Sequence, residues 1–182
     1  MRAKTIKRKC YTFDWDDTLV KTEAKVHVLV NGRRVKSITP TEYNTYSQQP
    51  GETFDMSDFT DPRFILAAKK YKLWPALENV ANAKKMGRSE SDIYILTARS
   101  DKAQMPIHTF LKRNGVDIPL DNIFTVGNDK GLEYDIAAEK RKILTALTGE
   151  YDVVYFFDDS EENVNLAKNI PGIKTRLVDW NK

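Results

Sequence analysis

The sequence predicts an α/β fold in which helices cover a mostly parallel sheet. Short apolar runs typical of buried strands alternate with segments that have the apolar spacing of helices. This alternation indicates strand, helix, strand units with right-handed crossovers. The 182 residues, of which 41% are hydrophobic and 30% charged, suit an ordinary chain with one core. We therefore expect one domain over residues 1–182, with residues 21–62 as an insertion after the first strand.

The first expected strand ends in a group of acids. Residues 11–13 are β-prone, and they are followed by Asp14, Asp16 and Asp17. Acids at the carboxyl end of a buried strand lie where open α/β sheets bind ligands. The alternative is an acidic turn in which Asp17 or Thr18 caps the next element.

The insertion begins with an expected β-hairpin over residues 25–39, because two β-rich arms flank Asn31-Gly32. His27 lies in the first arm, and a lone histidine in a hairpin is expected on the surface. Residues 39–62 are polar and punctuated by proline and glycine, so a long ordered loop is expected. Its aromatic side chains either stack on a substrate base or, as we favour, pack the loop onto the body. They are Tyr43, Tyr46 and Phe54.

Helices and strands alternate through the rest of the chain. Residues 64–86 have the spacing of two helices that meet near Trp74, and Gly87 is expected to end them. A later helix is expected to run through Leu111, and Gly115 ends it. The remaining strands are expected over 92–97, 122–126, 151–157 and 173–178, and the remaining helices over 134–147 and 162–169.

Charge and cysteine content exclude few function classes. The net charge of +3 is too small to indicate a polyanionic partner by itself. Two local groups of cations either contact phosphates or, as we favour, solvate sheet edges. They are Arg2, Lys4, Lys7, Arg8 and Lys9, and Arg33, Arg34 and Lys36. The single Cys10 excludes an internal disulfide and is expected in the core.

No apolar run approaches the roughly 20 residues of a membrane span, and the basic N-terminus leads directly into a strand. We therefore expect a cytoplasmic protein with no membrane partner. The sequence leaves the oligomeric state open.

The ends of the expected strands share one chemistry. Parallel strands finish at one edge of a sheet, so acids and a hydroxyl that are distant in sequence are expected to converge there. Carboxylates with a hydroxyl, and without a histidine or cysteine partner, suit a hard cation such as Mg²⁺. The converging residues are Asp14, Asp16, Thr97, Asp158 and Asp159.

A cation is expected to face these acids. Lys140 lies three, four and seven residues before Ile143, Leu144 and Leu147, so it shares the apolar face of its helix, whereas Lys142 does not. The alternative is a lysine whose stem covers apolar surface while its charge reaches water.

In chain order, these segments resemble the four motifs of the haloacid dehalogenase superfamily of phosphotransferases, and the resemblance covers most of the chain. It implies a three-layer, Rossmann-like parallel sheet with a flap after the first strand. The short insertion resembles members without a large cap domain, which often act on polynucleotide ends or proteins, although some act on nucleotides. The matching segments are Asp14-Trp15-Asp16-Asp17-Thr18, Ile95-Leu96-Thr97, Lys140 and Phe156-Phe157-Asp158-Asp159.

The resemblance implies a role for each residue. Asp14 is the expected nucleophile that becomes an aspartyl-phosphate, and Asp16 is the expected acid and base. Substrate phosphate is expected to be bound by Thr97-Ala98-Arg99 together with Lys140, which also neutralises Asp14. Arg99 has the alternative of a surface ion pair.

The implied Mg²⁺ ligands include Asp159 as the chief ligand and Asp158 in support, with Asp14 and the backbone carbonyl of Asp16. The chain departs from the family pattern at two positions. Asp17 stands where glycine is common, and Asn163 stands where an acid is common.

These features favour a Mg²⁺-dependent phosphomonoesterase, and the cations of the hairpin favour a nucleic-acid end as the phosphorylated substrate. Two alternatives remain open. One is a small-molecule nucleotidase, and the other is an inactive binding module of the same fold whose acids hold a structural metal.

Overall fold

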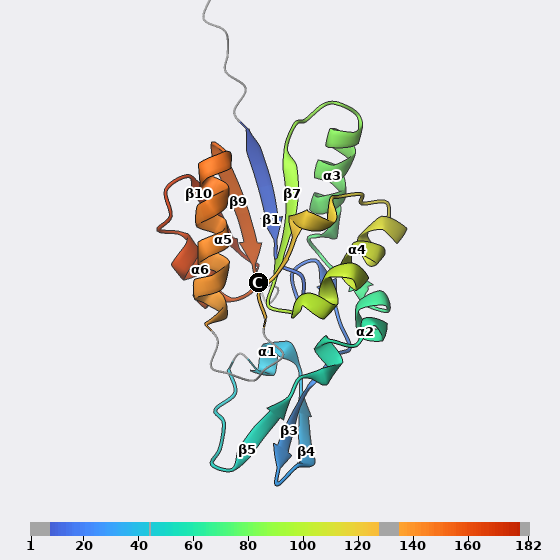
Figure 1. Cartoon of the computed structure of the whole chain (residues 1–182), viewed down its shortest axis with the longest axis vertical. Coiled ribbons are helices and arrows are strands. Elements are labelled where there is room, and N and C mark those ends of the chain that lie inside the picture. The colour runs from blue at the N-terminus through green and yellow to red at the C-terminus, as the bar shows by residue number, and fades with distance from the viewer. Residues whose placement is uncertain (1–7, 44, 128–134, 179–182) are drawn as a thin grey trace, which may run out of the picture.

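The structure is a computed structural model that describes residues 8–43, 45–127 and 135–178 (Figure 1). Its centre is a five-stranded parallel sheet with strand order β10-β9-β1-β7-β8. The expected α/β class is confirmed. The strands are β1 (Lys9–Phe13), β7 (Asp92–Thr97), β8 (Ile123–Thr125), β9 (Val153–Asp158) and β10 (Ile173–Leu177).

Helices cover both faces of this sheet, which gives three layers (Figure 1). One face packs against α3 (Trp74–Lys85) and α4 (Gln104–Arg113), and the other against α5 (Ile136–Glu150) and α6 (Glu161–Ala167). Alternate residues of β1 serve the two cores, with Phe13 in the first and Cys10 in the second. Cys10 is fully buried, as expected.

The strand register brings the acidic turn beside the end of β9. Phe13 pairs with Ile95 of β7 on one side and with Phe157 of β9 on the other. The backbone N–H of Asp14 also donates to the Phe157 carbonyl at 2.9 Å. Asp14 and Asp158 therefore leave neighbouring strands at the same carboxyl edge, which faces the insertion (Figure 1).

The insertion contains a second, antiparallel sheet with strand order β4-β3-β5, which lies below the parallel sheet in Figure 1. Asn31 and Gly32 have φ of 49° and 72°, so they form the tight turn of the expected hairpin. Residues 39–62 contain more helix and strand than the ordered loop that we expected. The elements are β3 (Val26–Val30), β4 (Arg33–Ile38), α1 (Pro40–Tyr43), β5 (Glu52–Asp55) and η1 (Ser57–Phe59).

Strand β5 forms because it has a partner. Its four residues pair with β3, and Phe54 packs edge-on against Tyr43 and Tyr46 at ring distances of 5.1 Å and 5.9 Å. These rings cover Val28 and the rest of the small core of the insertion. The three aromatic residues therefore pack, as favoured, but in the core of the insertion and not onto the body as expected.

The segment between the insertion and α3 differs from the sequence-based expectation. Two helices are present, but a short strand separates them and pairs antiparallel with a strand before the insertion. Helix α5 extends three residues beyond its expected end at Leu147, and its expected start at Tyr134 lies outside the described residues. The remaining elements are β2 (Val20–Lys21), α2 (Pro62–Leu66), β6 (Lys69–Lys70), η2 (Asp101–Ala103) and η3 (Leu120–Asn122).

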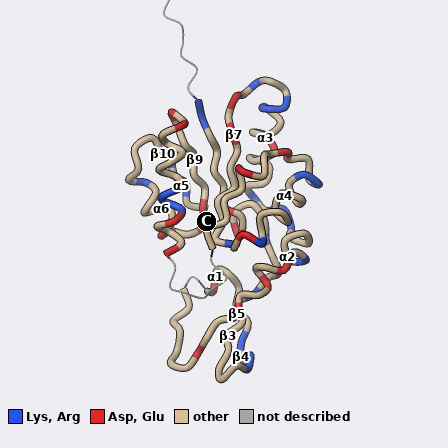
Figure 2. Tube along the Cα trace, in the orientation of Figure 1, with Lys and Arg blue, Asp and Glu red and all other residues tan. Residues whose placement is uncertain are grey.

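Of the two basic groups, Arg2, Lys4 and Lys7 lie outside the described residues. The Arg8 guanidinium lies 4.9 Å from the Tyr151 ring centroid. Arg33, Arg34 and Lys36 are exposed on β4 (Figure 2). None of the described helices has the length and apolar character needed to cross a membrane.

The expectation that His27 is a surface residue is wrong, because the side chain is 5% exposed. Its Nδ1 is 2.8 Å from the Ser37 Oγ on β4, and its Nε2 is 3.2 Å from Asp58 Oδ1 in η1. The other Asp58 oxygen accepts the Lys25 backbone N–H at 3.0 Å. His27 therefore joins β3 to β4 and to η1. Its burial depends on the packing of η1, which a pattern along β3 does not reveal.

Replacing His27 with alanine should loosen the insertion without unfolding the parallel sheet. The change leaves the partly buried Asp58 without its imidazole partner, at a cost of about 1–3 kcal/mol. Hydrogen exchange should show faster exchange for amides of β3 and β5, while amides of β7 keep their protection. Ser37→Ala, which removes only the exposed partner, should have a smaller effect, and equal acceleration in β7 would contradict the assignment.

Candidate active site

The candidate site is built around Lys140, which is 2% exposed on α5. Its Nζ donates to Asp14 Oδ1 at 2.6 Å and to Asp158 Oδ2 at 2.7 Å. Asp135 caps the N-terminus of α5 by accepting the Ala138 N–H with its carboxylate, and Lys140 shares the buried face of this helix with Leu144. Lys142 has a side chain that is 71% exposed and pairs with Glu139. The helical spacing therefore identified the inward-facing lysine.

Burial opposes the charge of the Lys140 ammonium, but the two adjacent carboxylates more than offset it. The pKa of Lys140 is accordingly raised, and the group stays charged. Burial also raises the pKa of Asp14 well above its usual value, opposed by Lys140 and reinforced by the charges of Asp158 and Asp159. Burial and the Asp158 charge raise the pKa of Asp159 to about 7. Negative charge thus exceeds positive charge at this edge of the sheet.

Asp158 is held by donors from the protein. Its Oδ1 accepts the Ser160 backbone N–H at 2.8 Å and the Asn163 side-chain amide at 3.0 Å, while Oδ2 accepts Lys140. Ser160 also caps α6 by accepting the Asn163 N–H. Asn163, which replaces the acid common in the family, therefore serves to orient Asp158.

The donor set at this edge fits a hard divalent cation. It consists of oxygen atoms, and its excess negative charge is what Mg²⁺ would neutralise. Because both Asp158 oxygens accept protein donors, whereas Lys140 contacts only Oδ1 of Asp14, Asp14 and Asp159 are the acids that fit a metal best. Within the described part of the chain, no three or more His, Cys, Asp or Glu side chains lie close enough together to hold a metal ion by themselves.

Thr97 and Arg99 lie at the end of β7, in a segment that is hydrogen-bonded to the residues that follow β8. Thr97 is 1% exposed, and its Oγ1 accepts the Arg99 N–H at 3.2 Å. The Arg99 carbonyl accepts the Gly127 N–H at 3.0 Å. A Cβ at Gly127 would lie 2.0 Å from the Ala98 carbonyl oxygen, so only glycine permits this approach. The segment that would face a substrate phosphate is therefore rigidly placed.

The Arg99 side chain forms a buried ion pair, not the surface pair considered as its alternative role. Its Nε and Nη2 donate to the two carboxylate oxygens of Asp16, both at 2.8 Å. Its Nη1 donates to the Phe59 carbonyl in the insertion at 2.7 Å. The structure thus brings Asp14, Asp158 and Lys140 into direct contact, and it joins the Asp16 side chain to Arg99. No sequence pattern signals this second contact.

Asp17 is a turn residue that also reaches the insertion. Its φ is 53°, in the left-handed region that glycine favours and aspartate tolerates. Its Oδ2 accepts the Thr41 hydroxyl of α1 at 3.0 Å, and burial raises its pKa. Glycine is common at this position in the superfamily that the motifs resemble, and the positive φ of Asp17 is a conformational reason for that preference.

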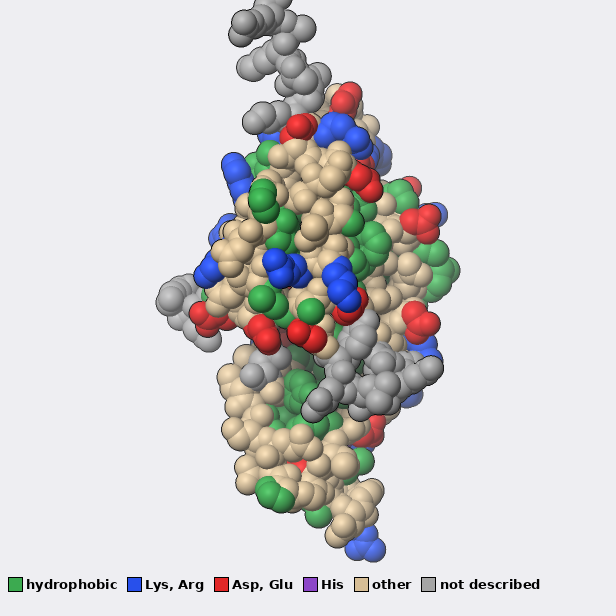
Figure 3. Space-filling view, turned by 60° about the vertical axis from the view of Figure 1, so that its left-hand side comes forward, with side chains coloured by type: hydrophobic (Ala, Val, Ile, Leu, Met, Phe, Trp, Pro, Cys, Tyr) green, Lys and Arg blue, Asp and Glu red, His purple; other side chains and the backbone are tan. Residues whose placement is uncertain are grey.

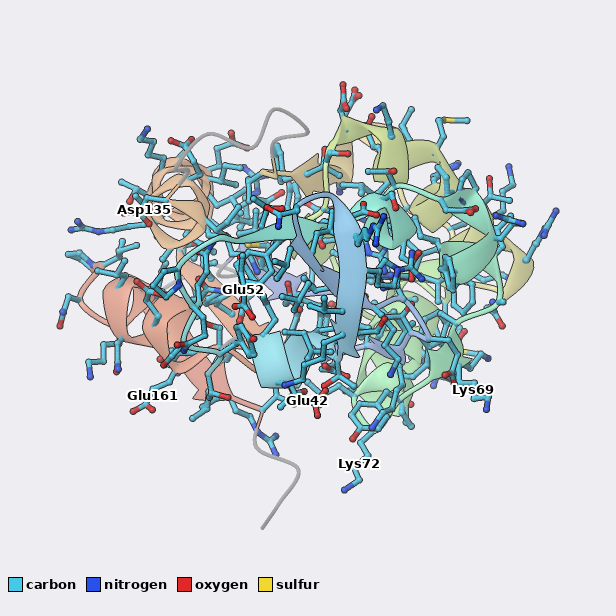
Figure 4. All side chains as sticks on the ribbon, turned by 90° about the horizontal axis from the view of Figure 1, so that it is seen from below. Glu42, Glu52, Lys69, Lys72, Asp135 and Glu161 are labelled. Atoms are coloured by element: carbon cyan, nitrogen blue, oxygen red, sulfur yellow. The ribbon has the colours of Figure 1, made fainter. Side chains whose placement is uncertain are left out.

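The insertion lies across the carboxyl end of the parallel sheet when the molecule is seen from below (Figure 4). Asp135 and Glu161, near the starts of α5 and α6, lie on its left in this view, and Lys69 lies on its right. Acidic side chains border the narrow waist between the two parts of the molecule in Figure 3.

Replacing Lys140 with methionine should destabilise the fold and abolish any chemistry at Asp14. The change leaves two buried carboxylates unpaired, at a cost of about 3–5 kcal/mol of unfolding free energy. Lys142→Met, two positions along the same helix, should cost less than about 0.5 kcal/mol because its ion pair is exposed. Urea denaturation of both variants measures the difference, and equal losses would argue against the buried lysine as a structural tie.

No protein-family model matches the sequence, and a search of curated proteins finds no match. Among solved structures, a chain in the structure of the Pnkp1/Rnl/Hen1 RNA repair complex is 16% identical with a TM-score of 0.53. The match covers 97% of this chain and 44% of that one. In a second structure of the Pnkp1/Rnl/Hen1 complex, the values are 18% identity, a TM-score of 0.53, and coverage of 98% and 47%. The chain thus spans less than half the length of these two neighbours.

The HAD domain of effector protein Lem4 from Legionella pneumophila is 13% identical with a TM-score of 0.46, and the match covers 93% of this chain and 85% of that one. Similarity at these identities bears on the fold alone. With a central parallel sheet between two helical layers and an insertion after the first strand, the chain shares a three-layer, Rossmann-like fold with the matched part of the two chains from the RNA repair complex.

Proposed function

We propose that the chain is a Mg²⁺-dependent phosphomonoesterase that works through an aspartyl-phosphate. The observation that carries this proposal is the buried contact of Lys140 with both Asp14 and Asp158 at the carboxyl edge of the sheet. A lysine that only covered apolar surface would extend its charge to water instead. Here the charge lies beside the acid that the motif pattern marks as a nucleophile.

Asp14 attacks the phosphorus with a carboxylate oxygen, so that a new P–O bond forms while the bond to the leaving oxygen breaks. Lys140 orients Asp14 and offsets the charge on the phosphoryl oxygens. Thr97 supports the same group. Because its oxygen accepts the Arg99 N–H, its own hydrogen can donate to a phosphoryl oxygen.

Asp16 supplies the proton that the leaving oxygen needs, and it then takes a proton from the water that attacks the aspartyl-phosphate. Hydrolysis releases inorganic phosphate and restores the Asp14 carboxylate. Asp14, Asp159 and the Asp16 backbone carbonyl would hold Mg²⁺. Asp158, which accepts from Asn163, would orient Lys140. When bound, the cation supplies the positive charge that the excess of carboxylates requires.

A phosphorylated nucleic-acid end is the substrate that we favour. The exposed Arg33, Arg34 and Lys36 on β4 offer contacts to a phosphate backbone (Figure 2). The first two structural neighbours come from an RNA repair complex, which supports the same substrate class. A free nucleotide has too few phosphates to use the cations of β4 in this way.

Replacing Asp14 with asparagine should remove phosphate release from a generic phosphate ester, because an amide cannot act as the nucleophile. Activity of the unmodified chain should require Mg²⁺ and be lost in EDTA. Asp117→Asn, which changes an exposed carboxylate away from the site, should keep full activity. Turnover that survives the change at Asp14 would refute the aspartyl-phosphate route.

A panel of oligonucleotides with a 3′- or 5′-phosphate, compared with free nucleotides, should distinguish the two substrate classes. Alanine at Arg33, Arg34 and Lys36 together should raise the KM for oligonucleotides about tenfold and weaken its dependence on salt. The KM for nucleotides should not change. Alanine at Lys112 and Arg113, exposed at the end of α4, serves as the charge-matched control. Preference for free nucleotides would favour the nucleotidase alternative.

A further inference from the structure

We propose that Arg99 is a positioning residue that orients Asp16 and makes this orientation depend on the insertion. The proposal rests on the proposed function, in which Asp16 is the acid and base. It replaces the expectation that the Arg99 side chain binds substrate phosphate directly.

The contact between Arg99 and Asp16 has the geometry of a planar fork. Two guanidinium nitrogens donate to two different carboxylate oxygens, and both distances are 2.8 Å. The Arg99 side chain is 1% exposed, whereas that of Asp16 is 17% exposed. A bidentate pair fixes the plane of the carboxylate as well as its position. Asp16 is therefore held in one orientation by a group that water does not reach.

The base of the Arg99 side chain is itself fixed. Its backbone N–H donates to Thr97 Oγ1, and its carbonyl accepts the N–H of Gly127. The ends of β7 and β8 thus set where the guanidinium begins, and it does not need substrate to become ordered. This preorganisation is what a positioning residue requires.

The third partner of Arg99 comes from the insertion. Nη1 donates to the Phe59 carbonyl at 2.7 Å, and the guanidinium carbon lies 5.0 Å from the centroid of the Phe59 ring. Phe59 follows Asp58, which is held by His27 and the Lys25 backbone. A continuous series of contacts therefore runs from the sheet of the insertion through Phe59 and Arg99 to Asp16.

Three of the five guanidinium N–H groups of Arg99 are taken, and the two that remain belong to a side chain that is 1% exposed, so a phosphate group could reach Arg99 only if these contacts moved. Its Nε, Nη1 and Nη2 already donate to Asp16 and Phe59. Releasing them would leave the Asp16 carboxylate and a carbonyl without their donors, which carries a cost of its own. The geometry favours a residue that acts on substrate through Asp16.

The test compares two phosphate esters whose leaving groups differ in their need for a proton. The leaving group of p-nitrophenyl phosphate departs readily as an anion, whereas that of glycerol 2-phosphate needs protonation. Arg99→Ala should lower kcat for glycerol 2-phosphate about 100-fold and have a much smaller effect on p-nitrophenyl phosphate. KM should change little for either ester. Arg99→Lys, which keeps the charge without the fork, should resemble Arg99→Ala.

Combination with Asp16→Asn separates positioning from binding. The double variant should be no slower than Asp16→Asn alone, because Arg99 acts through the group that has already been lost. Phe59→Ala should lower kcat for glycerol 2-phosphate about tenfold in the original chain and should have no effect beside Asp16→Asn. A raised KM for both esters in Arg99→Ala, with a loss that multiplies that of Asp16→Asn, would overturn the proposal and make Arg99 a phosphate ligand.

Melting temperatures test the Arg99–Asp16 ion pair without an activity assay. Arg99→Ala should lower the melting temperature because it leaves a partly buried carboxylate unpaired. Adding Asp16→Asn removes that charge and should recover part of the lost melting temperature. If the two changes instead lower the melting temperature independently, Arg99 does not hold Asp16. If the unmodified chain releases phosphate from neither ester, the proposed function fails, while the melting comparison still decides whether Arg99 holds Asp16.

Discussion

The structure depends on one buried ammonium held between two carboxylates. An unpaired lysine would be expensive to place at the junction of a helix and a sheet edge, and the chain meets this constraint by bringing Asp14 from β1 and Asp158 from β9 to Lys140. The side-chain amide of Asn163 on α6 donates to Asp158 and fixes its orientation. Two helices and two central strands are thereby joined through polar contacts at the edge where apolar packing ends. The same contacts orient the proposed nucleophile, so stability and reactivity share one set of atoms.

The balance of charge at this edge has a second effect. Lys140 alone does not neutralise Asp14, Asp158 and Asp159, and burial together with that excess of negative charge raises the pKa of Asp159. The fork of Arg99 offsets Asp16 separately. The chain therefore divides its acids between two cations, one that contacts the proposed nucleophile Asp14 and one that contacts Asp16, the proposed acid and base. This division keeps two nearby carboxylates, which would otherwise repel each other, in separate roles.

Much of the fold follows from local patterns. Apart from β10, the strands of the parallel sheet are apolar or β-prone runs, and the choice of Lys140 over Lys142 needs only the helical period. Strand β5 could not be read in the same way, because Glu52–Asp55 becomes a strand by pairing with β3. The burial of His27 and the fork of Arg99 also depend on which distant segment packs against them. Patterns along the chain carry information about faces and periods, whereas these contacts come from tertiary packing.

The short pairing of β2 with β6 has a consequence for how this molecule can change. Val20 lies beside Lys70 and Lys21 beside Lys69, so the polypeptide leaves the body for the insertion and returns to it at adjacent points. A segment with such closely spaced ends can be lengthened, shortened or exchanged for another without shifting the sheet that carries the acids. Only a few contacts then have to be rebuilt, and the one between Phe59 and Arg99 leads to Asp16 in the candidate site. Exchange of the insertion at the β2-β6 pair can in this way change the specificity while the parallel sheet stays the same.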